Sequence, residues 1–227
     1  MRFLFRSFID LLPISNTLSY FRKKVNRKDD GGWYGTHDFR YKVVSGLESK
    51  LNKGEILYFE IVGWVNEETT IMPPHDVTKT GLSDIKKKYG NSINYTYDCP
   101  AGDCKLYVYR ISLVNEDGIA VEQPWGYVVR RCGELGILHV PVLFGPTTLS
   151  HLAHLHSTDG HEALRRTVES FTEGSSTLNP AQIREGIVLR VESKLGISHV
   201  KNKSFVFGIL EGYLKEKEEY VDMEEIS

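Results

Sequence analysis

Two short stretches decide the fold, Glu185-Gly186-Ile187-Val188-Leu189-Arg190 and then Lys201-Asn202-Lys203. The first places an acidic residue and a glycine before a run of apolar, partly β-branched side chains, which predicts a strand over 186–192. Side chains alternate along a strand, so Lys201 and Lys203 should project from one side and Asn202 from the other. Together the stretches predict a carboxylate at the mouth of one strand, two ammonium groups on one face of the next, and a glycine that lets a ligand approach the backbone.

Two earlier strands extend this pattern. Residues 55–65 are rich in Ile, Tyr, Phe and Val and contain Glu60, and 105–114 contain Tyr107 and Tyr109. A site that moves the α-phosphate of a nucleotide needs cations, a carboxylate and an aromatic face for the base. On a regular strand Tyr107 and Tyr109 share a face and can stack a purine. Alone, each feature is also typical of a solvated strand face, a turn or cross-strand packing, so only the ordered set indicates a nucleotide site.

The remaining sequence predicts an α+β fold with antiparallel sheets. Helices are expected over 123–136, with Gly136 near the C-cap, and over 162–173. We also expect a short amphipathic helix before Pro13, a turn-rich insertion over 66–104, an extended segment over 140–144, a strand over 199–210 and a charged tail over 215–227. Strands interspersed with helices and joined by turns favour two sheets with flanking helices over a parallel α/β fold.

Composition excludes several classes of protein. The chain has 227 residues and a net charge of -2, so it has no global basic field for nucleic acid, although a local basic groove is compatible with these numbers. Cys99, Cys104 and Cys132 do not make a disulfide framework, and free thiols in a reducing compartment are expected. No membrane span or secretory signal is predicted, and the expected location is cytoplasmic.

Two further charged or metal-binding patterns have simple interpretations. The histidines at positions 151, 154, 156 and 161 are irregularly spaced, which favours a solvated loop over a zinc site. Lys86-Lys87-Lys88 is a surface charge run that can contact RNA phosphates but more simply faces solvent.

The ordered motifs resemble those of the ATP-dependent RNA ligase family, within the covalent nucleotidyltransferases that include DNA ligases and capping enzymes. They are Phe59-Glu60-Ile61-Val62-Gly63, Tyr107-Val108-Tyr109-Arg110-Ile111, Glu185-Gly186-Ile187-Val188-Leu189-Arg190 and Lys201-Asn202-Lys203-Ser204-Phe205. Ile71 to Asp76, Thr167 to Glu173 and Leu210-Glu211-Gly212 resemble a phage-like branch of these ligases. The resemblance covers 33–227, which we expect to be the nucleotidyltransferase domain, after a diverged or truncated segment over 1–32.

The resemblance implies a fold, a reaction and a set of roles. The fold would be two antiparallel sheets with flanking helices around a nucleotide cleft. Glu60 would hold the ribose of AMP, Tyr109 would stack on adenine, Glu185 would bind Mg²⁺ or Mn²⁺, and Lys201 and Lys203 would bind the α-phosphate. ATP would form a lysyl-AMP, the AMP would pass to an RNA 5′-phosphate, and a 3′-hydroxyl would then seal the strand. RNA ends are the expected partners, and no stable protein partner is expected.

The chain departs from the family pattern at its nucleophile. Lys28-Asp29-Asp30-Gly31 matches the family's Lys-x-Asp-Gly by letter, but Trp33 stands where an arginine is usual, and Gly35-Thr36-His37 follows too soon for an intervening strand. His37 replaces the arginine of Gly-Thr-Arg, and Gly208 stands where a lysine is common. We therefore interpret Lys28 as a loop lysine. An enzyme that seals only pre-adenylylated RNA, a non-catalytic remnant that binds nucleotide or RNA, and a DNA ligase or capping-type enzyme remain alternatives.

Overall fold

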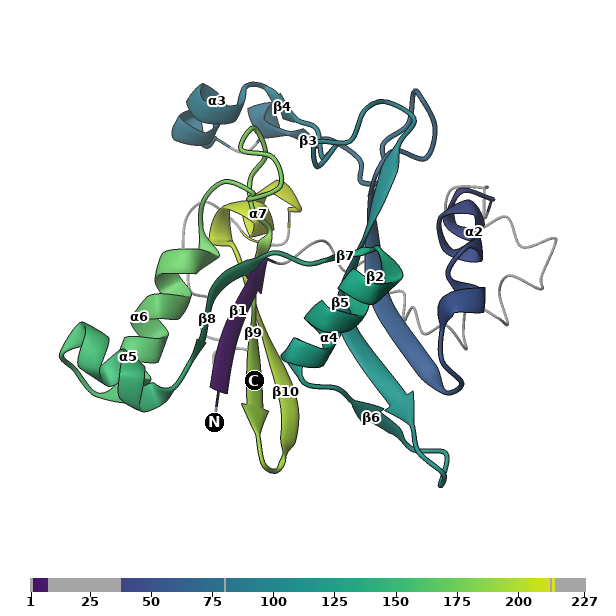
Figure 1. Cartoon of the computed structure of the whole chain (residues 1–227). Coiled ribbons are helices and arrows are strands. Elements are labelled where there is room, and N and C mark those ends of the chain that lie inside the picture. The colour runs from purple at the N-terminus through teal and green to yellow at the C-terminus, as the bar shows by residue number, and fades with distance from the viewer. Residues whose placement is uncertain (1, 8–37, 80, 213, 215–227) are drawn as a thin grey trace, which may run out of the picture.

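The protein is a mixed α/β structure with several sheets, described here from a computed structural model. The structure describes residues 2–7, 38–79, 81–212 and 214. Its two large sheets lie side by side, with α5 (Leu149–His156) and α6 (Gly160–Thr172) outside one sheet and α2 (Asp38–Ser45) outside the other (Figure 1). This arrangement turns one face of each sheet toward the other.

Sheet A has four antiparallel strands in the order β10-β9-β1-β8. These are β10 (Gly196–Lys203), β9 (Gly186–Ser193), β1 (Arg2–Ser7) and β8 (Val142–Thr147). The hairpin from β9 to β10 pairs Arg190 with His199, Val188 with Lys201 and Gly186 with Lys203. The predicted strand over 186–192 is therefore confirmed.

Sheet B is built on a long antiparallel pair, β2 (Glu55–Gly63) and β5 (Cys104–Val114), both predicted from the sequence. β6 (Ala120–Glu122) continues it through a tight turn at 115–118, and β7 (Leu138–His139) adds a parallel pairing to β5. α4 (Trp125–Leu135) connects β6 to β7 and ends at Gly136, whose left-handed backbone (φ 67°) makes the predicted C-cap. Its buried residues, Trp125, Val128, Cys132 and Leu135, join the core of sheet B.

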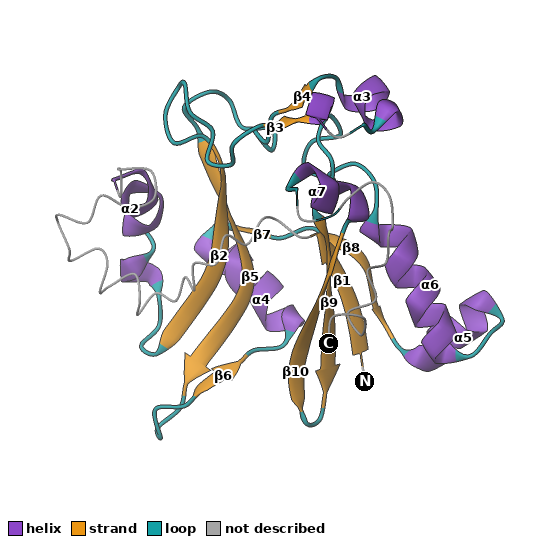
Figure 2. Ribbon diagram, turned by 180° about the vertical axis from the view of Figure 1, so that it is seen from behind, coloured by secondary structure: helices purple, strands orange, loops and turns teal. Residues whose placement is uncertain are grey.

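The turn-rich segment between β2 and β5 crosses from sheet B to sheet A at one end of the molecule (Figure 2). It contains β3 (His75–Asp76), η2 (Val77–Lys79), α3 (Ser83–Tyr89) and β4 (Ser92–Ile93). It docks on α7 (Phe205–Leu210), where the ring of Tyr95 lies 5.8 Å from that of Phe207. The Gln182 side chain fastens it further, donating to the Asn94 carbonyl at 2.5 Å. The insertion therefore ties the two sheets together at this end.

Three sequence predictions about secondary structure were wrong. Arg2–Ser7 is a strand rather than part of a helix, because both of its backbone edges pair, one with β8 and one with β9. The strand expected over 199–210 ends at Lys203, because the Ser204 hydroxyl accepts from Phe207 N at 3.1 Å and caps α7. The histidine segment expected as a loop is the helix α5, capped by Thr148.

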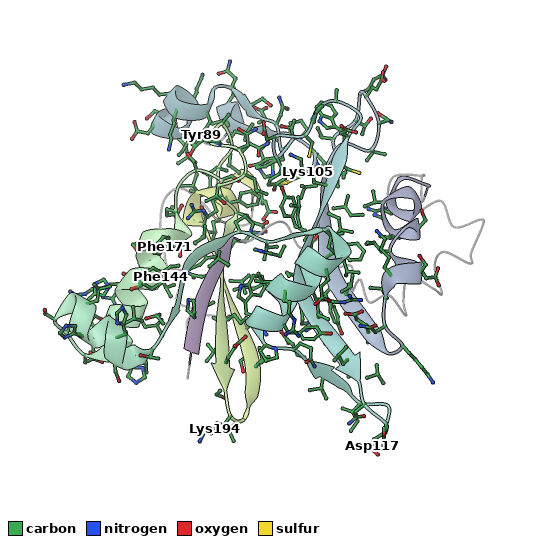
Figure 3. All side chains as sticks on the ribbon, in the orientation of Figure 1. Tyr89, Lys105, Asp117, Phe144, Phe171 and Lys194 are labelled. Carbon is green, nitrogen blue, oxygen red and sulfur yellow. The ribbon has the colours of Figure 1, made fainter. Side chains whose placement is uncertain are left out.

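The helix expected over 162–173 is α6, which begins two residues earlier because Asp159 caps it by accepting from His161 N and Glu162 N. Its apolar side packs on the outer face of sheet A. There Ile187 and Leu189 contact a group that includes Phe144 and Phe171, whose ring centroids are 5.6 Å apart (Figure 3). Odd-numbered residues of β9 are thus buried against α6, which leaves its even-numbered side chains for the face toward sheet B.

Candidate active site

One face of the β9–β10 hairpin carries a row of charged side chains. Period-two alternation puts Arg190 and Glu192 of β9 on the same side as His199, Lys201 and Lys203 of β10. Asn202 points the other way, where its amide donates to Thr172 Oγ1 of α6 at 2.6 Å. The predicted arrangement of Lys201, Lys203 and Asn202 is therefore present in the structure.

At one end of this face lies the lysine cluster, which we define as Glu60, Glu185, Lys201, Lys203 and Glu211. Burial lowers the pKa of Lys201, the nearby carboxylates of Glu185 and Glu60 oppose that change, and the charge of Lys203 adds to it. Lys201 thus lies within electrostatic reach of a carboxylate from sheet B, Glu60, and of one from sheet A, Glu185. Three segments that are distant in the sequence converge here.

Glu185 is the fixed acid of the lysine cluster. It is only 3% exposed, its Oε1 lies 3.3 Å from Lys203 Nζ, and its backbone carbonyl accepts from Ser204 N at 2.7 Å. A buried carboxylate needs such a cation nearby, because desolvation alone would favour its neutral form. The ion pair between Glu185 and Lys203 therefore joins the start of β9 to the end of β10.

Gly186 has a structural reason to be glycine. Its φ is +153°, and a Cβ there would lie 2.2 Å from the Asn202 carbonyl oxygen and 2.8 Å from Lys203 Cα. The space beside Gly186 is filled by the backbone of β10 rather than left open toward a ligand. The glycine lets β9 and β10 close together, and so sets where Lys203 stands relative to Glu185.

Lys203 also contacts residues around α7. Its ammonium group forms a second ion pair with Glu211 Oε2 and lies 5.2 Å from the centroid of the Phe207 ring. His75 from the insertion packs edge-on against Phe207 at 5.2 Å, and its Nδ1 is 3.0 Å from the Tyr95 hydroxyl. Burial lowers the pKa of His75, Glu211 opposes this and Lys203 adds to it. The insertion therefore forms part of the wall of the lysine cluster.

The aromatic residues expected to stack a base are placed by a β-bulge. Phe59 pairs with Val108 and Tyr58 with Arg110, so Tyr109 is the extra residue of the bulge. The simple alternation that put Tyr107 and Tyr109 on one face is interrupted there, and Tyr107 is buried. Tyr109 is half-buried, and its ring centroid lies 6.3 Å from that of Tyr58. Of the two tyrosines, Tyr109 remains the candidate for contact with a base.

The other end of the same face carries the arginine cluster, which we define as Arg110, Glu122, Arg190, Glu192 and His199. Arg190 is completely buried and donates to Glu122 at 2.5 Å, Glu192 at 2.7 Å and the Gln123 carbonyl at 2.6 Å. His199 Nε2 lies 2.8 Å from Glu122 Oε1. Burial raises the pKa of Glu122, but the hydrogen bond and charge of His199, with Arg190 and Arg110, outweigh it and leave the pKa lowered. Sheets A and B are joined here by ion pairs.

Arg110 connects the arginine cluster to the aromatic residues of sheet B. Its guanidinium lies 3.5 Å from the centroid of the Tyr58 ring and 3.9 Å from Glu122 Oε2. Since Tyr58 and Glu60 share a side of β2, the face with Arg110 and Tyr58 also carries Glu60. The cross-sheet contacts of Glu122 show that this face of sheet B is turned toward the charged face of the hairpin.

Several sequence-derived residues lie outside these clusters. Lys28 and His37 fall outside the described residues, as do the boundary after residue 32 and the tail over 215–227. Gly208 is buried within α7. The three cysteines are free thiols, with Cys99 and Cys132 buried. Lys86, Lys87 and Lys88 lie in the last turn of α3.

The sequence interpretation missed three charged residues that belong to this face. His199 could have been found by extending the period-two pattern back from Lys201. Glu122 had no signal, since a three-residue strand gives no periodicity. Glu211 was noted only as part of a motif that resembles the ligases. Its closeness to Lys203 depends on α7, and that helix was not predicted because the strand was expected to continue past Lys203.

Comparisons with known proteins found one distant similarity to describe. No protein-family model matches the chain, and no curated protein matches it. Among solved structures, the chain is similar to a mutant RNA ligase from Naegleria gruberi solved with ATP and Mn, with 18% identity and a TM-score of 0.39. The match covers 74% of this chain and 38% of that chain, so this chain spans well under half of the ligase it matches.

None of the helices in the described residues is long and apolar enough to cross a membrane. Within the same residues, no three or more His, Cys, Asp or Glu side chains are grouped so that they could hold a metal ion by themselves.

Proposed function

We propose that this chain is the nucleotidyltransferase domain of an ATP-dependent RNA ligase, and that the lysine cluster is its nucleotide site. The observation that carries the proposal is the convergence of Glu60, Glu185 and Lys203 around Lys201, across two sheets. Burial of Glu185 accounts for one nearby cation. The proposal rests on the further presence of Lys201 and of Glu60 from the other sheet, because transfer of a nucleotidyl group needs fixed cations and an acid in one place.

The chemistry of the cluster fits the parts of a nucleotide. Lys201 and Lys203 would bind the α-phosphate and offset the negative charge that develops on it during in-line displacement. Glu60, on the facing strand, would accept hydrogen bonds from the ribose, and Tyr109 would pack against adenine. The ammonium group of Lys203 already pairs with carboxylates, so an entering phosphate would compete with its partners Glu185 and Glu211.

The acids present also fit a divalent cation. Mg²⁺ and Mn²⁺ prefer carboxylate oxygens, and Mg²⁺ is commonly held by one or two carboxylates together with substrate phosphates and water. Glu185 would be the protein ligand, and the metal would supply further positive charge beside the phosphate.

The test is covalent labelling. The protein is incubated with ATP labelled at the α-phosphate and Mg²⁺ or Mn²⁺, denatured, and examined for bound label, and peptide mapping then locates the modified lysine. A second assay offers pre-adenylylated RNA and an RNA 3′-hydroxyl. Label or sealing supports the proposal, and sealing without label places the activity in the last step only.

The substrate is tested in parallel with DNA ends and with GTP. A preference for RNA ends and ATP is expected. Sealing of DNA alone, or label from GTP alone, would replace the RNA ligase assignment with one of the related covalent nucleotidyltransferases. Absence of label and of sealing in both assays would leave a protein that does not catalyse the reaction, and the proposal would be wrong.

A further inference from the structure

We propose that Glu211 is a positioning residue that occupies the place of a substrate phosphate on Lys203, so that its departure limits the affinity of the site for nucleotide. This inference deepens the proposed function and rests on it. It concerns a residue to which the reaction described above gives no role. Four observations support it. They are the two ion pairs of Lys203, the difference in burial between its two partners, the position of α7 directly after Lys203, and the charges of the cluster.

Lys203 has two carboxylate partners. Glu185 Oε1 lies 3.3 Å from its ammonium nitrogen, and Glu211 Oε2 forms a closer ion pair with the same atom. An ammonium group has three donors, and a phosphate would compete for them with oxygens of the same charge and similar geometry. A phosphate that takes more than one hydrogen bond from Lys203 must therefore displace at least one carboxylate.

The two carboxylates differ in how firmly they are held. Glu185 is 3% exposed and stands directly before β9, with its backbone carbonyl bonded to Ser204 N. The Glu211 side chain is 27% exposed and stands at the C-cap of α7, where the described chain nears its end. A side chain at a helix terminus can change rotamer without moving a strand. Glu211 is consequently the partner that can leave.

The position of α7 gives Glu211 its effect on the site. The helix begins immediately after Lys203, because Ser204 caps it. At its other end Glu211 N donates to Phe207 O at 3.0 Å, and this helical turn places the Glu211 side chain beside Lys203. Phe207, between the two in sequence, is buried and packs against His75 and Tyr95. The carboxylate is thus presented to Lys203 by a short, fixed helix.

The charges around the site make this contact matter for an anion. The lysine cluster contains two lysines and three carboxylates, so its net charge is negative when all five groups are ionised. Displacing Glu211 leaves it neutral, and a divalent metal would make it positive. While it stays close, Glu211 both competes for Lys203 and repels the phosphate. Removing its charge should remove both effects and tighten binding.

The experiment measures binding without turnover. Isothermal titration with MgATP, and separately with inorganic tripolyphosphate, is carried out on the wild type, Glu211→Gln, Glu211→Asp and the control Glu169→Gln. Glu169 is an exposed acid on α6 that pairs with Arg165, so the control removes the same charge away from the site. We expect Glu211→Gln to bind both probes about tenfold more tightly, Glu211→Asp to resemble the wild type, and Glu169→Gln to be unchanged.

A double-mutant cycle distinguishes a positioning role from a general effect. In a Lys203→Ala background, Glu211→Gln should give a much smaller gain, because only the repulsion between its charge and the phosphate is then removed. An undiminished gain without Lys203, or an equal gain from Glu169→Gln, would overturn the inference. Thermal denaturation of each variant checks that it folds, and Glu211→Ala, which also removes the charge, tests the inference if Glu211→Gln does not fold.

The outcomes separate this inference from the proposed function. If the wild type binds MgATP and Glu211→Gln binds it no more tightly, Glu211 does not occupy the place of a phosphate, and the proposed nucleotide site is still supported. If no variant binds MgATP but Glu211→Gln binds tripolyphosphate more tightly than the wild type does, the inference about Glu211 is supported and the proposed nucleotide function is wrong. If no variant binds either probe, both are wrong.

Discussion

The lysine cluster and the arginine cluster stand at opposite ends of one hairpin face and use charge in opposite ways. Arg190 is completely buried and has three hydrogen-bond acceptors in fixed positions, two of them carboxylates. Lys203 is one-third exposed and pairs with two carboxylates, Glu185 and Glu211. Charges that are buried and matched hold two sheets together, whereas partly exposed charges can exchange partners. The hairpin therefore joins a structural end to the end that we propose binds nucleotide.

The largest effect should come from removing the buried cation. Arg190→Met leaves Glu122 and Glu192 beside each other without their arginine, and breaking a buried ion pair costs about 3–5 kcal/mol of unfolding free energy. Urea denaturation measures the loss. The matched control is Arg165→Met, an exposed arginine of α6 whose solvent-screened ion pairs should contribute little to stability. Equal losses in the two variants would show that the arginine cluster is not what joins the sheets.

Lys203→Ala should impair RNA sealing much more than it lowers the stability of the fold. Loss of a cation that we propose contacts the reacting phosphate should lower the rate of RNA sealing about 100-fold or more. The loss of stability should be smaller than in Arg190→Met, because Lys203 is partly exposed and Lys201 still lies near Glu185. Lys194→Ala, at the exposed tip of the same hairpin (Figure 3), is the control and should seal normally. Glu185→Ala should likewise abolish sealing and weaken the response to Mg²⁺ or Mn²⁺. Normal sealing by both Lys203→Ala and Glu185→Ala would mean that the site is misassigned.

The arginine cluster should also make the stability of the fold depend on pH in the acidic range. The pKa of Glu122 is below its ordinary value of 4.5 in the folded protein, so its contribution is complete above pH 4.5 and is lost as the pH falls through the lowered pKa. Thermal denaturation from pH 6 down to pH 3 should show a smaller acid destabilisation in Glu122→Gln than in the wild type. If the two proteins lose stability in parallel, Glu122 is not a linked group.

The smallest effect is expected at Lys201. Burial and Lys203 hold its pKa below the ordinary 10.5, so nucleotide binding should weaken as pH rises through that lowered pKa. Lys201→Arg keeps a positive charge throughout this range and should flatten the alkaline limb of a plot of affinity against pH. A limb that is unchanged in Lys201→Arg would assign the titration to another group.

The elements that the sequence predicted are those with their own periodic pattern or cap. β2, β5 and β9 were found from apolar, β-branched runs, and α4 and α6 from helical spacing with Gly136 and Gly174 after them. β1 was missed because its partners come from β8 and β9, far along the chain, and nothing local distinguishes it from a short helix. α7 was missed because Ser204 reads as part of an alternating strand until its capping bond is seen.

In the candidate site, too, the features that could be predicted are those that depend on local sequence alone. Lys201, Lys203 and Asn202 could be assigned to opposite faces because alternation is a local rule. The bulge at Tyr109 and the approach of β10 to Gly186 depend on a partner strand, and no single segment encodes them. Glu122 reaches Arg190 only through the packing of two sheets, so its role could not be predicted from either stretch alone.

The position of β1 has a consequence for synthesis on the ribosome. Its Arg2–Ser7 backbone lies between strands made from residues 142–147 and 186–193, whereas β2 to β7 pair within residues 55–139. β1 must therefore wait for both β8 and β9, while the segment from β2 to β7 can fold as it emerges. Nascent chains stalled before residue 186 would leave the edge of β1 that pairs with β9 uncovered, and they should be the species that chaperones retain and that self-associate when released.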